Sequence, residues 1–251
     1  MTEHAPIPAA TLILYRERDS VAEHLFVERS AKMAFAAGAL VFPGGRVDQD
    51  DYIVAATRPD LERDDAAARV TAIRETLEEA GVAVGFEPAL SASQAADLRQ
   101  SLSGGATLSA WLADHAIELD LDALVPFARW RPNFKEHRIF DARFYIAQIG
   151  FDAHAASVDA TENVHLFWAR AADVIARAEA GEAHLIYPTM RNVERLAQLV
   201  NFDVALTHLA EHPVRLITPF VESRDGVDHL CIADGLGYPI TARPLAEARR
   251  G

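Results

Sequence analysis

Cysteine is almost absent from this 251-residue sequence, and Cys231 is its single example. One thiol excludes an internal disulfide and a cysteine-rich zinc site, so we interpret Cys231 as a small core residue rather than a nucleophile. No apolar run reaches the length that crosses a bilayer, and the N-terminus lacks the basic-then-apolar order of a secretion signal. We therefore expect a soluble, cytoplasmic protein without a membrane partner.

Basic residues are also scarce, because 24 lysines and arginines stand against 37 aspartates and glutamates, for a formal net charge of −13. Proteins that follow a nucleic-acid backbone are normally basic, so we expect no nucleic-acid partner. A small phosphorylated ligand is still compatible, because an acidic protein can carry a local basic pocket. Internal repeats and low-complexity linkers are lacking too, and half of the residues are hydrophobic. We predict a single domain over residues 1–251.

The most informative stretch is a predicted helix that ends at Gly81. Apolar residues recur upstream at helical spacing, at Val70, Ile73, Leu77 and Ala80, and gather on one side. Glycine at the end is typical of a helix that stops in a left-handed conformation. This apolar face is expected to dock on a sheet.

Three carboxylates, those of Glu75, Glu78 and Glu79, fall on the opposite side of this helix. They repel one another, and they lie near the helix C-terminus, where the macrodipole disfavours anions. One interpretation is a solvated acidic face; the other is a site for a hard cation such as Mg²⁺, which prefers oxygen ligands. The helix alone does not decide between them.

The upstream turn Pro43-Gly44-Gly45 follows a short apolar strand, and its glycines allow the backbone to approach a ligand closely. Turn and helix together resemble the signature of the Nudix hydrolases. That signature reads Gly, five residues, Glu, seven residues, then Arg-Glu-apolar-x-Glu-Glu-x-Gly-apolar. Gly45 supplies the first glycine. The second half is matched without a gap, apart from Thr76 at a usually apolar position, by Arg74, Glu75, Glu78, Glu79, Gly81 and Val82. With both halves, the metal-site interpretation is favoured over the solvated face.

The spacing departs from this signature, because Gly45 lies 30 residues before Glu75 rather than 15. We predict that the extra residues form an inserted loop at about 48–65, with Asp64 or Asp65 as the N-cap of the helix.

Counting back from Arg74 places the isolated glutamate of the signature on Ala66, which cannot supply a carboxylate. Asp65 and Glu62 are the candidates that we consider as replacements.

A second pattern precedes the turn and resembles the Nudix branch that cleaves coenzyme A. It reads Arg-Ser, two residues, Leu or Met, Arg, three residues, Gly, three residues, Phe-Pro-Gly-Gly. The matching residues are Arg29, Ser30, Met33, Gly38 and Phe42-Pro43-Gly44-Gly45. Ala34 replaces the pattern's Arg, which removes one fork-shaped phosphate partner, and Phe26-Val27-Glu28 replaces its leading Leu-Leu-Thr. Arg29 and Ser30 are candidate substrate-binding residues; the alternative is that residues 29–38 are only a loop between strands.

Two helices, predicted at residues 93–102 and 108–115, form an insertion at about 91–118. The segment has no counterpart in the smallest Nudix domains. One interpretation is that this segment shapes a lid or a pocket wall; the other is that it is only a packing appendage.

Strands are predicted at residues 124–130 and 139–149, and the loop between them holds the densest positive charge of the chain. We expect at least one of Arg131, Arg138 and Arg143 to grip a substrate phosphate. The alternatives are a solvated turn and a structural ion pair of Arg143.

The remainder is predicted as a strand at residues 163–168, helices at 171–180, 187–199 and 202–211, and a C-terminal strand-turn-strand extension from Arg215. Glu162 stands just before the first of these elements. Many Nudix enzymes place an additional Glu in this region, so Glu162 is a candidate metal ligand or base, against the alternative of an exposed turn.

The Nudix resemblance implies an α/β (α+β) fold, a mixed sheet sandwiched between helices. It also implies a hydrolase in which Glu75, Glu78, Glu79 and the carbonyl of Gly45 hold Mg²⁺ or Mn²⁺. Arg74 would orient Glu75 or Glu78, and Glu79 or Glu162 would accept the proton of the attacking water.

The resemblance implies cleavage of coenzyme A or an acyl-CoA into 3′,5′-ADP and (acyl-)4′-phosphopantetheine. ADP-ribose or another nucleoside diphosphate derivative is the alternative substrate. The alternative from a different functional class is a catalytically silent Nudix fold that senses a ligand or binds a protein. The resemblance also allows a homodimer, because Nudix folds often pair.

Overall fold

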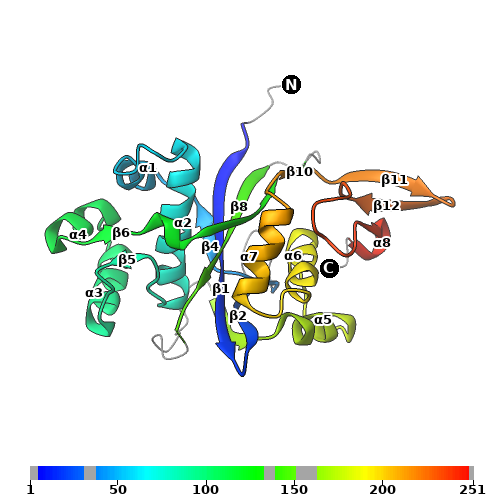
Figure 1. The fold of residues 1–251 in the computed structure, drawn as a ribbon, viewed down its shortest axis with the longest axis horizontal. Helices are drawn as coiled ribbons and strands as arrows, with labels where there is room; N and C mark the ends of the chain where they lie inside the picture. Colours follow the sequence, from blue (N-terminus) through cyan, green and yellow to red (C-terminus); the bar gives the residue numbers. More distant parts are fainter. Residues whose placement is uncertain (1–4, 31–37, 133–138, 151–162, 249–251) are drawn as a thin grey trace.

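A computed structural model describes residues 5–30, 38–132, 139–150 and 163–248 (Figure 1). It has a mixed α/β fold, as predicted. An eight-stranded sheet has the strand order β10-β7-β8-β1-β2-β3, with β4 added beside β1 and β9 beside β2. The strands are β1 (Ile7–Arg18), β2 (Val21–Arg29), β3 (Leu40–Val41), β4 (Gly44–Arg46), β7 (Val125–Trp130), β8 (Phe140–Gln148), β9 (Asn163–Ala169) and β10 (Leu216–Ile217).

Strand β1 is the axis of the sheet. One edge pairs in parallel with β8 at residues 7–15; the other pairs antiparallel, first with β4 at residues 9–11 and then with β2 at residues 15–18. Side chains of β1 alternate between two cores, because successive residues of a strand point to opposite faces. Leu12 and Leu14 belong to one core, and Ile13 and Tyr15 belong to the other.

Helices cover both faces of the sheet. Figure 1 shows α1–α4 on one side and α5–α7 on the other. The first group is α1 (Gln49–Ala55), α2 (Arg63–Ala80), α3 (Ala92–Ser103) and α4 (Leu108–His115). The second group is α5 (Ala171–Glu179), α6 (Tyr187–Leu196) and α7 (Phe202–Glu211).

Several short elements complete the fold. They are β5 (Phe86–Glu87), β6 (Glu118–Leu119), the 3₁₀ turn η1 (Leu121–Ala123), β11 (Phe220–Arg224), β12 (Val227–Cys231), β13 (Ala242–Pro244) and α8 (Leu245–Ala248). The C-terminal hairpin turns at Asp225 and Gly226, which both have positive φ. No helix within the described ranges combines the length and the apolar composition that crossing a bilayer would require.

The long helix α2 confirms the predicted apolar face, because Val70, Ile73, Leu77 and Ala80 are all fully buried. It ends at Gly81, whose φ of 69° is left-handed. Its start differs from the prediction. The N-cap is Glu62, whose carboxylate accepts hydrogen bonds from the backbone N–H groups of Asp64 and Asp65, both at 2.9 Å.

The expected loop at 48–65 is also wrong in part, because helix α1 occupies residues 49–55. Asp48 precedes it, and its backbone N–H donates to Asp51 Oδ2 at 2.9 Å, which secures the first turn. The two helices predicted at residues 93–102 and 108–115 are confirmed as α3 and α4.

Candidate active site

The Gly44-Gly45 turn lies against the C-terminal half of α2. Strand β4 is held there by β1, with Gly45 opposite Ala10 and Gly44 opposite Thr11. A Cβ atom on Gly45 would overlap the carboxylate of Glu75, and one on Gly44 would overlap the carbonyl oxygen of Ala10. Only glycine fits at both positions, which explains the sequence of this turn.

The three glutamates of α2 do not form an open, solvated face. The backbone N–H of Gly44 donates to Glu79 Oε2 at 3.1 Å, and Glu79 is buried. The side chains of Glu75 and Glu78 are 17% and 34% exposed. The structure therefore brings four of the predicted residues, the three glutamates and Gly45, to one place between β4 and α2.

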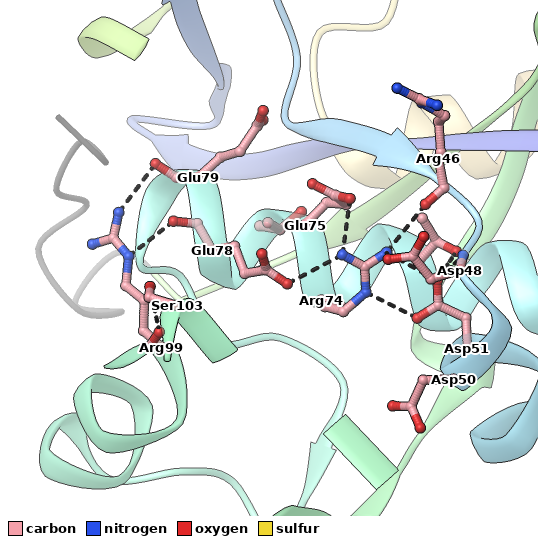
Figure 2. Close-up of polar contacts among 12 residues, drawn as sticks. Arg46, Asp48, Asp50, Asp51, Arg74, Glu75, Glu78, Glu79, Arg99 and Ser103 are labelled. Carbon is pink, nitrogen blue, oxygen red and sulfur yellow. Dashed lines mark hydrogen bonds and ion pairs between the residues drawn. The ribbon is translucent and has the colours of Figure 1, made fainter. Parts of the chain in front are cut away.

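Arg74 is the hub of this region (Figure 2). Its Nη1 donates to Glu75 Oε1 at 2.9 Å and to Glu78 Oε1 at 3.1 Å. Its Nε and Nη2 donate to the two carboxylate oxygens of Asp51, both at 2.9 Å. Nη2 also reaches the carbonyl of Arg46 at 3.1 Å, beside Gly45. One planar guanidinium thus ties the turn, α1 and two of the helix carboxylates together.

Asp51 is the site residue that the sequence analysis missed. It is fully buried, and besides Arg74 it accepts a hydrogen bond from Thr71 Oγ1 at 2.8 Å. Five residues separate it from Gly45, so counting forward from that glycine places Asp51 on the isolated glutamate of the signature. Counting back from Arg74 instead crosses the inserted residues and ends on Ala66.

Glu62 and Asp65 do not take this role, since both are engaged at the other end of α2. Asp65 pairs with Arg69 at 2.7 Å and accepts from Tyr145 Oη at 2.8 Å. Arg143 bridges Asp65 and Glu62, at 3.1 Å each. At 1.5 Å per residue, Asp65 lies about 15 Å along the helix from Glu75.

Charge is unbalanced around the hub. Arg74 contacts four carboxylates, those of Asp48 (3.7 Å), Asp51, Glu75 and Glu78. Burial by itself lowers the pKa of Arg74, and these anionic partners more than offset it, so the pKa is raised. Burial raises the pKa of Glu75 to about 7, with Arg74 opposing and the charge of Glu78 adding to the shift. The cluster therefore lacks positive charge.

A hard divalent cation would supply that charge, and carboxylate oxygens are the ligands it prefers. Among the described residues, no three Asp, Glu, His or Cys side chains converge closely enough to enclose an ion in this structure. The donor chemistry fits nonetheless, because Glu75 and Glu79 contact the glycine turn and Glu78 adds a third carboxylate beside Arg74.

The other predicted residues lie apart from the hub or outside the described ranges. Arg29 ends β2, with its N–H bonded to the carbonyl of Ala39 at 3.0 Å, and Ser30 follows it directly. Arg131 approaches Asp141 Oδ2 at 3.7 Å. Arg138 and Glu162 lie outside the described residues. Arg143 has structural partners in Asp65 and Glu62, which agrees with the alternative of a structural ion pair for this residue.

Comparison with known proteins places this geometry in a known class. A crystal structure of a NUDIX hydrolase from Alicyclobacillus acidocaldarius is similar, with 28% sequence identity and a TM-score of 0.71, over 82% of this chain and 97% of that one. The NUDIX domain of Shewanella oneidensis NrtR, complexed with ADP ribose, matches at 14% identity and a TM-score of 0.45, over 78% of this chain and 88% of that one. No protein-family model matches the chain. No curated protein matches it either.

The structural neighbours are thus Nudix hydrolases, and the predicted fold class is confirmed. The similar structure supports an enzyme, a pyrophosphohydrolase. Neither comparison distinguishes the coenzyme A branch.

Proposed function

We propose that this chain is a divalent-metal-dependent hydrolase that cleaves the diphosphate of coenzyme A or an acyl-CoA. The observation that carries the metal-dependent chemistry is the contact between the Gly44-Gly45 turn and the carboxylates of Glu75 and Glu79. It gathers carboxylate oxygens and a closely approaching backbone, the donors that Mg²⁺ and Mn²⁺ prefer.

Glu75, Glu78, Glu79 and the backbone carbonyl of Gly45 would hold the cation. When bound, Mg²⁺ or Mn²⁺ neutralises phosphate charge and lowers the pKa of the attacking water. Arg74 holds the carboxylates of Glu75 and Glu78 in position through Nη1, a supporting role.

Asp51 in turn fixes the plane of the Arg74 guanidinium with two hydrogen bonds. Glu79 or Glu162 accepts the proton of the attacking water, which requires a carboxylate within hydrogen-bond reach of that water.

The substrate assignment rests on the sequence pattern that runs from Arg29-Ser30 to Phe42-Pro43-Gly44-Gly45. Of the arginines proposed to grip phosphate, Arg131 is the better candidate among the described residues. Its side chain is 39% exposed, and its ion-pair contact with Asp141 is long, at 3.7 Å. Arg143 is 18% exposed and pairs closely with two carboxylates.

Chromatographic product analysis with Mg²⁺ tests this proposal, with coenzyme A, acetyl-CoA and ADP-ribose offered side by side. We expect 4′-phosphopantetheine (acylated from acetyl-CoA) and 3′,5′-ADP. Cleavage of ADP-ribose alone would keep the diphosphate chemistry and discard the coenzyme A substrate. If none of the three is cleaved with Mg²⁺ or Mn²⁺, the proposal fails and a catalytically silent binding module is favoured.

A pair of variants ties turnover to the site. Glu78→Gln removes one carboxylate of the cluster without changing the size of the side chain, and we expect it to abolish turnover while the fold is kept. Glu118→Gln is the matched control, because Glu118 is exposed on the short strand β6, remote in sequence from the hub. Turnover that survives in Glu78→Gln would place the metal site elsewhere.

A further inference from the structure

The C-terminal end of α2 has an electrostatic problem that the helix does not solve itself. Its last turn carries Glu78 and Glu79 but no basic residue. The carbonyls of the last turn point out of the helix and form the negative end of its dipole. Gly81 N–H satisfies only the carbonyl of Leu77 among them, at 2.9 Å.

Arg99 supplies the missing cation from a different helix. Its Nε donates to the carbonyl of Glu78 at 2.9 Å, and its Nη2 donates to the carbonyl of Glu79 at 3.3 Å. Figure 2 shows its guanidinium at the end of α2, on the side away from Arg74. A single side chain thus binds the backbone of two of the three glutamates that are proposed as metal ligands.

Helix α3 holds Arg99 firmly enough for this contact. Leu98, the preceding residue, is fully buried in the core that packs on α2, and Ala95 is buried one turn earlier. Asp97 accepts a hydrogen bond from Trp111 Nε1 at 2.9 Å, which joins α3 to α4. The orientation of Arg99 is therefore determined by packing in the insertion at 91–118.

We propose that Arg99 is a positioning residue for the carboxylate cluster. It secures the last turn of α2 and places a positive charge at the negative helix end. In that way the backbones of Glu78 and Glu79 stay where the Glu78 side chain reaches Arg74 and the Glu79 side chain reaches the N–H of Gly44. This inference rests on the proposed function of the same site, and it gives the helical insertion a role in catalysis that is neither a lid nor a pocket wall.

The test compares Arg99→Ala, Arg99→Lys and the control Asp97→Ala in the full chain. Asp97→Ala loosens α3 against α4 but keeps both carbonyl contacts. Amide hydrogen exchange over residues 77–82 reports on the helix end without any metal or substrate. Mn²⁺ binding, followed by electron paramagnetic resonance, and steady-state kinetics report on the carboxylates.

For Arg99→Ala we expect exchange at residues 77–82 to become about tenfold faster, and kcat to fall about tenfold with KM little changed, as for other outer partners of metal ligands. Mn²⁺ binding should weaken in parallel. Arg99→Lys should recover part of each loss, because one ammonium can still reach a carbonyl. Asp97→Ala should resemble the wild type in all three measurements.

Unchanged exchange in Arg99→Ala would overturn the inference, as would equal losses in Asp97→Ala, which would assign the effect to packing of α3. A wild type that neither binds Mn²⁺ nor hydrolyses any substrate would instead refute the proposed function. In that case the hydrogen-exchange measurement alone tests the role of Arg99. Faster exchange in Arg99→Ala but not in Asp97→Ala would still show that Arg99 secures the last turn of α2.

Discussion

Replacing Asp51 with asparagine is the most incisive perturbation of this structure, because Asp51 anchors Arg74 and is fully buried. The variant keeps the volume of the side chain but removes its charge. It also turns an amide N–H₂ group toward a guanidinium that needs an acceptor. Removal of one partner of a buried ion pair costs about 3–5 kcal/mol, because the other charge is left uncompensated.

The structure favours the lower end of that range for Asp51→Asn. Arg74 keeps Glu75 and Glu78 as partners, and the side chain of Glu78 is 34% exposed, so part of the charge is still compensated. We therefore expect a loss of about 3 kcal/mol in the free energy of unfolding. With a urea m-value of about 3 kcal/mol per M for a chain of this size, the midpoint should fall by about 1 M.

Urea unfolding followed by circular dichroism measures this loss. The value of kcat at saturating Mg²⁺ measures the effect on the carboxylate cluster. We expect kcat to fall about tenfold or more, because Arg74 would no longer be held against Glu75. Asp60→Asn is the matched control, since Asp60 pairs with Arg58 at the surface with its side chain 60% exposed. A midpoint and a kcat in Asp51→Asn equal to those of the control would refute the reasoning.

Three further predictions concern the same helix. Gly45→Ala should lower kcat about a hundredfold, because its Cβ would overlap the carboxylate of Glu75. Gly150→Ala should leave kcat unchanged, since among the described residues no heavy atom beyond its chain neighbours lies within 4 Å of a Cβ there. Mn²⁺ affinity, measured by calorimetry, should be about tenfold weaker at pH 6 than at pH 8, because a carboxyl with a pKa of about 7 must lose its proton to bind a cation; a flat profile would contradict this pKa for Glu75. Arg143→Ala should lower the free energy of unfolding by about 1 kcal/mol, because the ion pairs with Glu62 and Asp65 are lost. If KM also rises, Arg143 contacts the substrate.

Helix α2 could be predicted from the sequence because the signals that specify it lie within the helix itself. An apolar period of 3.6 residues and a terminal Gly81 specify the helix and its buried face without reference to the rest of the chain. The same holds for the C-terminal hairpin around Asp225-Gly226, whose residues tolerate the positive φ that the turn needs.

The partner of Arg74 was not predictable in the same way. When an insertion interrupts a motif, its positions can be counted from either end with different results. Only the fold shows at which point of the motif the extra residues are inserted. Asp51 also offered a signal that was overlooked: Asp48 and Asp51 are three residues apart, as in a capping box, which marks a helix start within the supposed loop. That helix carries Asp51 to the hub.

Arg99 had no sequence signal at all, because its contact depends on how α3 packs on α2. Together with Asp51 it shows how two segments outside α2 hold the carboxylate-bearing stretch of that helix. The segment after Gly45 brings Asp51 to the guanidinium that holds Glu75 and Glu78. The insertion at 91–118 brings Arg99 to the carbonyls of the last turn. The carboxylate-bearing stretch of α2 is therefore held at its start through a side chain and at its end through the backbone. Its geometry depends on both holds, and a packing appendage without such contacts would leave the last turn of α2 free to fray.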